Sequence, residues 1–268
     1  MPGNSPARGR CLVGAASLRG RVRPGYDLWM LLLFDIDGTL LLTERAGVLA
    51  MQEAGQALYG ERFSLEHVSL AGRLDPLIWR DGLAAAGIEA DEQKHARFQD
   101  AYARALGERL RARPTARALP GVLPLLAHLR GLQDTTLGLV TGNYAETGTI
   151  KLRAAGLDPG WFPVRAWGAD GAHRRDLPPV AMQRYQLHAG RSIAPERVVV
   201  IGDTPGDIDC ARANGCLAVA VATGPAYTLD ELRAHEPDLL LEDLSDATRL
   251  LDWLGARRDG EAARGTWG

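Results

Sequence analysis

The stretch LLLFDIDGT (residues 31–39) decides the fold, because four apolar residues run directly into two carboxylates and a glycine. An apolar run of this kind is typical of a buried strand, which would deliver Asp35 and Asp37 to its carboxyl end. In open α/β sheets, ligands bind at that edge. The alternative is that the two acids lie in a solvated turn. The rest of the chain distinguishes between these two interpretations.

Short apolar runs and helical patterns alternate from residue 118 onward. The predicted strands are residues 137–140, 162–167, 198–201 and 217–221, and the predicted helices are residues 122–129, 146–155, 177–188, 206–214 and 245–254. This alternation predicts an α/β fold with a doubly wound, Rossmann-like parallel sheet. Residues 44–112 look helical throughout and predict an inserted all-helical cap, with helices at residues 46–59, 75–86 and 91–111.

The domain boundaries follow from this change of pattern. The expected α/β core comprises residues 30–43 and 114–255, the helical cap residues 44–113, and a disordered tail residues 256–268. Residues 1–29 contain five arginines and a single acid, without apolar periodicity. They are expected to be a disordered extension, or to reflect a start assigned too early with Met30 as the natural start; an organelle transit segment is the third possibility.

Composition excludes several classes of protein. The 268 residues are 46% hydrophobic and 24% charged with a net charge of −2, so a disordered chain and a globally basic nucleic-acid or membrane binder are not expected. The longest apolar stretch, residues 28–34, is far shorter than the roughly 20 residues of a membrane span. Cys11, Cys210 and Cys216 have no zinc spacing and leave one cysteine unpaired in any disulfide scheme, so a reducing cytoplasm is expected. We expect the protein to be a monomer or a homodimer.

A second acidic motif follows another apolar run. Residues 198–201 lead into Gly202 and Asp203, with Asp207 four residues later at the start of a predicted helix. If this strand neighbours the first, up to four carboxylates meet at one edge of the sheet. Crowded carboxylates raise one another's pKa unless a cation lies among them, and hard oxygen ligands suit Mg²⁺. The two motifs together predict a metal site.

A third strand end supplies polar groups of another kind. Residues 137–140 lead into Thr141, Gly142 and Asn143, which precede a predicted helix. A hydroxyl group and backbone N–H groups at a helix N-terminus can bind phosphate. These three residues are therefore predicted to bind a phosphate group.

These motifs, in this order, resemble those of the haloacid dehalogenase superfamily. The resemblance spans about residues 30–255 and rests on the sequence DIDGT at residues 35–39, Thr141, a basic residue, and Asp203 with Asp207. It is similar in particular to the phosphoglycolate phosphatase-like group, whose helical cap is inserted after the first motif. The resemblance implies a phosphatase.

The resemblance also implies a role for each acid. Asp35 would attack phosphorus and form an aspartyl-phosphate, while Asp37 would protonate the leaving oxygen and later activate water. Mg²⁺ would be bound by Asp35, Asp203 and the backbone carbonyl of Asp37. Asp207 would support the metal through water or a hydrogen bond; a simple interaction with the helix dipole is the alternative.

The family's third motif is a Lys or Arg that holds the phosphoryl group. Two candidates, Arg174 and Arg175, precede the helix predicted to begin at Leu177. We choose Arg174, because relatives of this type place the basic residue three positions before that helix, and Arg175 is the alternative. Arginine can bind phosphate through two donors.

The predicted cap contains one segment that resembles its relatives. In residues 71–75, Arg73 or Asp75 is a candidate to reach the site. Asp75 followed by Pro76 also fits a helix N-cap with proline at the first helical position, and this is the favoured interpretation.

The predicted function is Mg²⁺-dependent hydrolysis of a small, phosphoglycolate-like phosphate monoester. Two alternatives remain, a sugar phosphomutase of the same superfamily and a non-catalytic binding domain on the same scaffold. Dehalogenases do not usually carry the second acid found at Asp37, which argues for phosphoryl chemistry.

Overall fold

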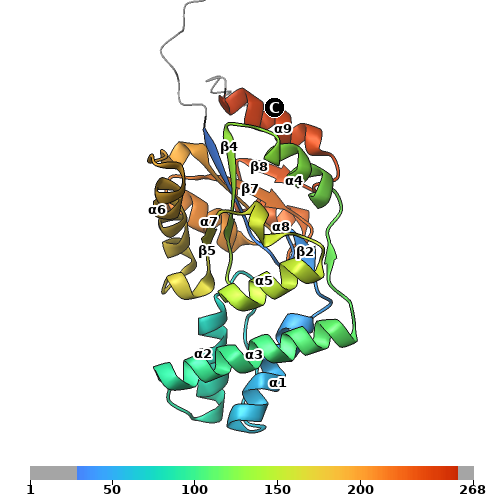
Figure 1. The fold of residues 1–268 in the computed structure, drawn as a ribbon, viewed down its shortest axis with the longest axis vertical. Coiled ribbons are helices and arrows are strands. Elements are labelled where there is room, and N and C mark those ends of the chain that lie inside the picture. Colours follow the sequence, from blue (N-terminus) through green and yellow to red (C-terminus); the bar gives the residue numbers. More distant parts are fainter. Residues whose placement is uncertain (1–28, 259–268) are drawn as a thin grey trace, which may run out of the picture.

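The computed structural model describes residues 29–258 of the chain (Figure 1). The predictions for residues 1–28 and 259–268 therefore lie outside the described residues. None of the helices within residues 29–258 combines the length and apolar character that crossing a membrane requires.

A six-stranded parallel sheet forms the centre of the molecule. Its spatial order is β5-β4-β1-β6-β7-β8, and β1 pairs in parallel with both β4 and β6. The strands are β1 (Met30–Phe34), β4 (Thr135–Val140), β5 (Val164–Ala166), β6 (Val198–Gly202), β7 (Leu217–Val221) and β8 (Leu239–Leu241). The predicted doubly wound α/β fold is confirmed.

Helices cover both faces of this sheet. The helices α4 (Val122–Arg130), α5 (Ala145–Ala154) and α9 (Ala247–Arg258) pack on the face that holds Leu32 and Phe34. The opposite face, with Leu31 and Leu33, is covered by α6 (Leu177–Ala189), α7 (Pro205–Ala213) and α8 (Leu229–Arg233). Successive side chains of a strand point to opposite faces, so the uninterrupted apolar run of β1 supplies both cores at once.

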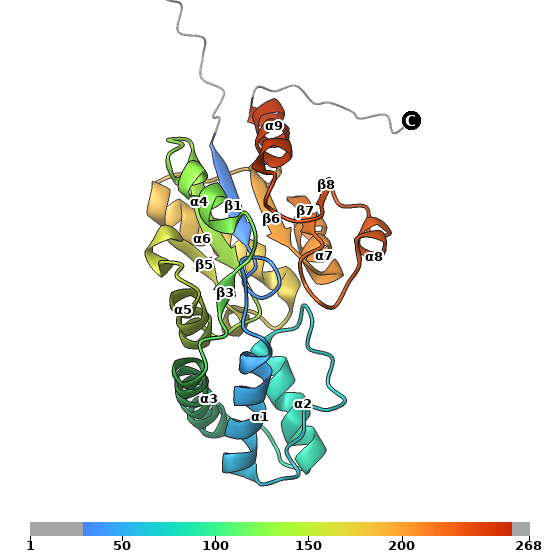
Figure 2. The same cartoon turned by 90° about the vertical axis from the view of Figure 1, so that its right-hand side faces the viewer.

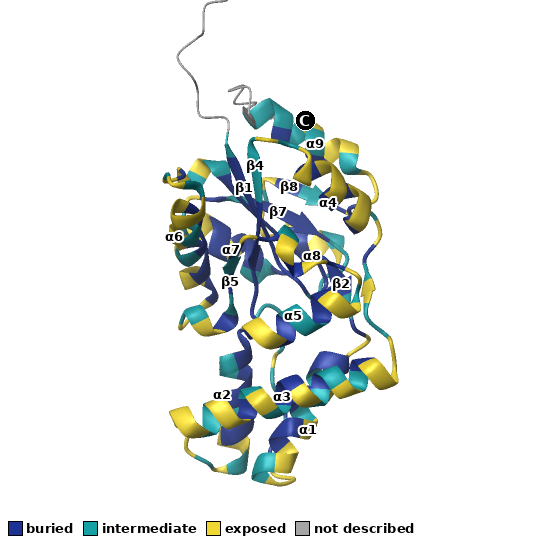
Figure 3. Ribbon diagram, viewed as in Figure 1, coloured by how far each residue is buried: buried dark blue, intermediate teal, exposed yellow. Residues whose placement is uncertain are grey.

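Three helices form a separate layer beyond the carboxyl ends of the strands (Figure 2). These are α1 (Ala46–Tyr59), α2 (Asp75–Ala86) and α3 (Glu92–Ala112), here called the α1–α3 segment. It has its own core, in which Phe63, Trp79 and Phe98 are buried. The outer surfaces of the segment are largely exposed, whereas the inner surfaces are buried (Figure 3).

A short antiparallel pair joins the α1–α3 segment to the sheet. Strand β2 (Leu41–Leu42) pairs with β3 (Arg117–Ala118), so the chain leaves the sheet and returns to it at one place. The hydroxyl of Thr115 donates to the Thr43 carbonyl at 2.9 Å, which ties the two connections further. This pair was not predicted, because two-residue strands leave no periodicity to detect.

Other differences from the prediction concern the C-terminal third of the chain. Strand β8 and helix α8 were not predicted, since both are short, and α9 continues to Arg258 where a disordered tail was expected from residue 256. Within residues 29–258, the remaining short elements are four 3₁₀ turns, at Pro159–Trp161, Gly168–Asp170, Arg174–Asp176 and Pro195–Arg197.

Candidate active site

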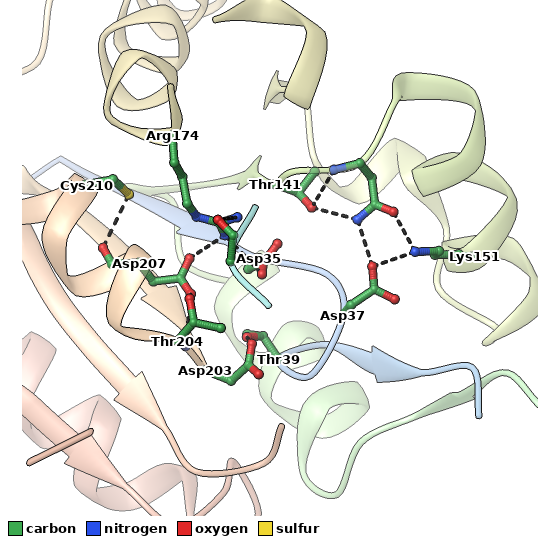
Figure 4. Close-up of polar contacts among 12 residues, drawn as sticks. Asp35, Asp37, Thr39, Thr141, Lys151, Arg174, Asp203, Thr204, Asp207 and Cys210 are labelled. Atoms are coloured by element: carbon green, nitrogen blue, oxygen red, sulfur yellow. Dashed lines mark hydrogen bonds and ion pairs between the residues drawn. The ribbon is translucent and has the colours of Figure 1, made fainter. Parts of the chain in front are cut away.

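The ends of three adjacent strands bring the predicted motifs together. Asp35 follows β1, Thr141 follows β4 and Asp203 follows β6, and these strands are neighbours in the sheet. Carboxyl ends of parallel strands meet at one edge, and Figure 4 shows the side chains converging there.

Three buried carboxylates form a compact group at this edge. Asp35, Asp203 and Asp207 each offer an oxygen, and these oxygens lie within 4.8 Å of one another. The Thr39 hydroxyl donates to Asp203 Oδ1 at 3.2 Å. Gly38 has a φ of 79°, and a Cβ there would lie 2.2 Å from Asp203 Oδ2, so glycine is required at this turn.

Burial makes the charged form of these acids unfavourable. Desolvation raises the pKa of Asp35 to about 6, against the opposing effect of Arg174, and also raises the pKa of Asp203 well above its ordinary value. A divalent cation among the oxygens would offset this repulsion. The donor set consists of hard oxygen ligands, the type that Mg²⁺ prefers, and therefore fits the predicted ion.

Arg174 lies against the carboxylate group. Its Nη2 is 3.0 Å from Asp35 Oδ2 and 2.5 Å from Asp207 Oδ1, and its side chain is only 8% exposed. Arg175, the alternative candidate, has a 62% exposed side chain that pairs with Asp209. The structure thus brings Arg174, and not Arg175, to the site.

Asp207 is held by two sets of contacts. Oδ2 accepts hydrogen bonds from the Thr204 hydroxyl at 2.7 Å and the Thr204 N–H at 3.1 Å, in a capping box at the start of α7. Oδ1 accepts from Arg174. The residue therefore caps its helix and orients Arg174, while its predicted support of a metal stays a prediction.

The Asp37 carboxylate lies apart from the other three acids. Asp37 Oδ2 accepts hydrogen bonds from Asn143 Nδ2 at 2.8 Å and from Lys151 Nζ at 2.6 Å. It is not part of the three-carboxylate group, so the metal contact predicted for Asp37 rests on its backbone carbonyl. Figure 4 shows the Asp37 side chain directed toward Lys151.

Lys151, on α5, is a site residue that the sequence analysis missed. Two features of the sequence could have pointed to it. Lys151 is one of only two lysines in a chain rich in arginine. It also lies on α5, the helix that follows β4 and the predicted phosphate-binding residues.

The predicted phosphate-binding residues lie together beside Asp35. Asn143 Nδ2 donates to the Thr141 hydroxyl at 2.9 Å, and Thr141 lines the same cavity as Asp35. A Cβ on Gly142 would lie 2.0 Å from the Arg73 carbonyl, so the α1–α3 segment approaches this backbone too closely for any other residue. The Gly142 carbonyl accepts the Asp75 N–H at 2.7 Å.

The favoured interpretation of Asp75 as a helix N-cap is wrong. Leu74 occupies the N-cap of α2, and Asp75 is the first helical residue. Its Oδ2 instead accepts the N–H of Tyr144 at 3.0 Å, a partner far away in the sequence. This long-range contact could not be read from local spacing, and burial raises the pKa of Asp75 to about 6.

Replacing Asp75 by asparagine should stabilise the protein at alkaline pH. The folded-state pKa of about 6 exceeds the ordinary 3.8, so removing the charge should gain about 1 to 3 kcal/mol at pH 8. Between the two pKa values the folded protein keeps its proton while the unfolded chain has lost it. The gain should therefore fall to about half at pH 5 and vanish below about pH 4.

Urea denaturation of Asp75→Asn and of the wild type at several pH values measures this difference. Asp100→Asn, at an exposed position on α3, is the control and should change little at any pH. A difference that does not vary with pH would contradict the electrostatic cause.

A cavity of about 650 Å³ connects these groups to the α1–α3 segment. Asp35, Asp37, Lys151 and Arg174 line its sheet side. Arg73 and Asp75 also reach it, as the sequence suggested for this segment, although Arg73 is paired with Asp81. The opposite wall is largely apolar and contains Val48, Met51, Val68, Leu70 and Ile78.

Several known proteins are similar to this chain in sequence or in fold. The chain is 30% identical to a phosphoglycolate phosphatase of Synechococcus elongatus, over 80% of this chain and 93% of that protein. It is 27% identical to the tyrosine-protein kinase PtkA of Mycobacterium tuberculosis, over 76% and 71% of the two chains. A hydrolase from Pseudomonas syringae superposes with a TM-score of 0.60 at 25% identity, covering 84% of this chain and 98% of that one.

The chain also matches a known protein family over more than half of its length. The haloacid dehalogenase-like hydrolase family matches residues 32–212, which include the three strand ends and both acidic motifs. By this match, the chain belongs to the haloacid dehalogenase-like hydrolases.

Proposed function

We propose that the protein is a Mg²⁺-dependent phosphatase that hydrolyses a small, phosphoglycolate-like phosphate monoester through an aspartyl-phosphate. The observation that carries this proposal is the grouping of Asp35, Asp203 and Asp207 around Arg174 at the ends of β1 and β6. Such a site combines a nucleophile, ligands for a cation and a fixed positive charge for a phosphoryl group. The related phosphoglycolate phosphatase supports the proposed class of substrate.

In the first step, a carboxylate oxygen of Asp35 attacks phosphorus and the bond from phosphorus to the ester oxygen breaks. Protonated Asp37 gives its proton to that oxygen, which leaves as an alcohol. Arg174 lies within 3.0 Å of Asp35, where it can hold the oxygens of the transferring group. Thr141 and the backbone N–H groups after it would bind the same oxygens.

In the second step, water attacks phosphorus of the aspartyl-phosphate, and Asp37 now takes a proton from that water. The bond from phosphorus to Asp35 breaks, which releases phosphate and restores the carboxylate. Asp35, Asp203 and the Asp37 carbonyl would hold Mg²⁺, with Asp207 in support. The bound ion supplies the positive charge that offsets repulsion between the phosphate and the carboxylates.

We also propose that the α1–α3 segment is the cap of this site, as the predicted division at residues 44–113 implies. Its loop contacts both Arg174, through the Gly72 carbonyl at 3.3 Å, and Gly142. Enclosure of this kind keeps bulk water from the reacting group.

Removal of divalent metal should abolish activity. Hydrolysis of 4-nitrophenyl phosphate is expected to fall by about 100-fold or more in EDTA and to recover when Mg²⁺ is added back, because the buried carboxylates otherwise repel the phosphate. Asp203→Asn should stay slow even in excess Mg²⁺. Phosphoglycolate, a hexose phosphate and a nucleoside monophosphate, ranked by kcat/KM, would then identify the substrate. Full activity in EDTA would contradict the proposal.

A further inference from the structure

A buried lysine contacts the proposed acid and base of the reaction. We propose that Lys151 is a positioning residue, which fixes one oxygen of Asp37 so that the other is presented to the reacting group. The inference rests on the proposed function and deepens it, because neither the motifs nor the proposed chemistry assigns a role to Lys151.

Lys151 keeps its positive charge although burial of an ammonium group is unfavourable. Its side chain is 6% exposed, and an ammonium group in such a place is destabilising unless it is fully paired. Desolvation lowers the pKa of Lys151, but Asp37 and Asp75 outweigh this effect and keep the pKa above its ordinary value. The ammonium donates to Asp37 Oδ2 and to Asn143 Oδ1, each at 2.6 Å.

The α1–α3 segment leaves room for this side chain. Gly47, near the start of α1, approaches it so closely that a Cβ would lie 3.1 Å from both Cε and Nζ of Lys151. The α1–α3 segment also supplies a negative charge near Lys151, the carboxylate of Asp75 on α2. Lys151 is therefore held between the sheet and the α1–α3 segment, whereas a lysine on the surface is free to move.

The two oxygens of Asp37 have different surroundings. Oδ2 accepts hydrogen bonds from both Lys151 and Asn143. Oδ1 accepts none from any residue between 29 and 258, on a side chain that is 42% exposed and lines the cavity. Two donors on one oxygen fix the plane of the carboxylate, and the remaining oxygen is available for proton exchange.

This arrangement has a consequence that depends on the leaving group. Phenol is a much weaker acid than 4-nitrophenol, so loss of phenoxide needs a proton from Asp37, whereas loss of 4-nitrophenoxide does not. Hydrolysis of the aspartyl-phosphate needs Asp37 with either ester. Misplacing Asp37 should therefore slow the first step for phenyl phosphate only, and the second step for both.

The test compares Lys151→Met with Lys94→Met, which changes the only other lysine of the chain. Lys94 has a side chain that is 36% exposed and pairs with Asp91, and it does not line the cavity. For Lys151→Met, kcat/KM for phenyl phosphate should fall about 100-fold, but for 4-nitrophenyl phosphate less than about tenfold. Lys94→Met should match the wild type with both esters.

A second readout follows the aspartyl-phosphate itself. Rapid mixing of Lys151→Met with 4-nitrophenyl phosphate should release a burst of 4-nitrophenol approaching one equivalent per enzyme, because formation of the intermediate outpaces its hydrolysis. Lys151→Arg, which keeps the cation, should recover part of the activity. Lys151→Gln is neutral but keeps a polar side chain, and it should show the same difference between the two esters as Lys151→Met. This second variant keeps the test valid if Lys151→Met does not fold.

Equal losses of kcat/KM for the two esters would overturn the positioning role and leave Lys151 as a packing residue. No loss with either ester would overturn it as well. If the wild type hydrolyses neither ester in Mg²⁺, the proposed function itself fails, and the inference fails with it.

Discussion

Asp35→Asn is expected to lower kcat for 4-nitrophenyl phosphate by at least about 10⁴-fold, because an amide cannot replace the carboxylate as nucleophile. The substitution keeps the size of the side chain and removes one charge from the group that it forms with Asp203 and Asp207. Since burial already raises the pKa of Asp35, the protein should fold at least as well without this charge.

Steady-state hydrolysis in Mg²⁺ and thermal unfolding together check this result. Asp209→Asn is the matched control, because Asp209 is an exposed acid on α7 that pairs with Arg175 outside the cavity. It should retain wild-type turnover. Comparable rates for Asp35→Asn and the wild type would eliminate Asp35 as the nucleophile.

Arg174→Met is expected to damage both stability and activity. The substitution leaves Asp35 and Asp207 buried without their shared cation, and breaking a buried ion pair costs about 3 to 5 kcal/mol. Loss of the charge that faces the phosphoryl group should also lower kcat/KM by about 100-fold or more.

Arg175→Met provides the comparison at the neighbouring position. The exposed pair of Arg175 and Asp209 should contribute at most about 1 kcal/mol, and activity should be unchanged. Urea denaturation and 4-nitrophenyl phosphate kinetics measure both effects. A larger loss of activity from Arg175→Met than from Arg174→Met would reverse the assignment of the phosphate-binding arginine.

The sequence predicted the elements that depend on local pattern. Helices α1 and α2 begin and end at the predicted residues, and their ends were marked by Gly60 and Gly87, which follow them directly. The central strand was equally clear, since its apolar run is uninterrupted and ends at two acids. Patterns of this kind involve only residues that are close together in the sequence, so they can be recognised without knowledge of the tertiary fold.

Contacts between distant segments could not be predicted in the same way. Asp75 and Pro76 have the local pattern of a helix cap, but the Asp75 carboxylate instead accepts the N–H of Tyr144. Lys151 belongs to the site because α5 packs beside the end of β1, and no spacing along the chain encodes that distance. The sequence thus indicated the carboxylates and Arg174, while their partners required the three-dimensional arrangement.

The pairing of β2 with β3 makes the molecule modular. Because residues 42 and 117 lie opposite each other in this pair, the chain enters the insert and leaves it at one place. Lengthening or exchanging that insert leaves the order of the six parallel strands untouched. With the proposed role of the α1–α3 segment as the cap, substrate preference can change through this insert without altering the strand ends that hold Asp35, Thr141 and Asp203.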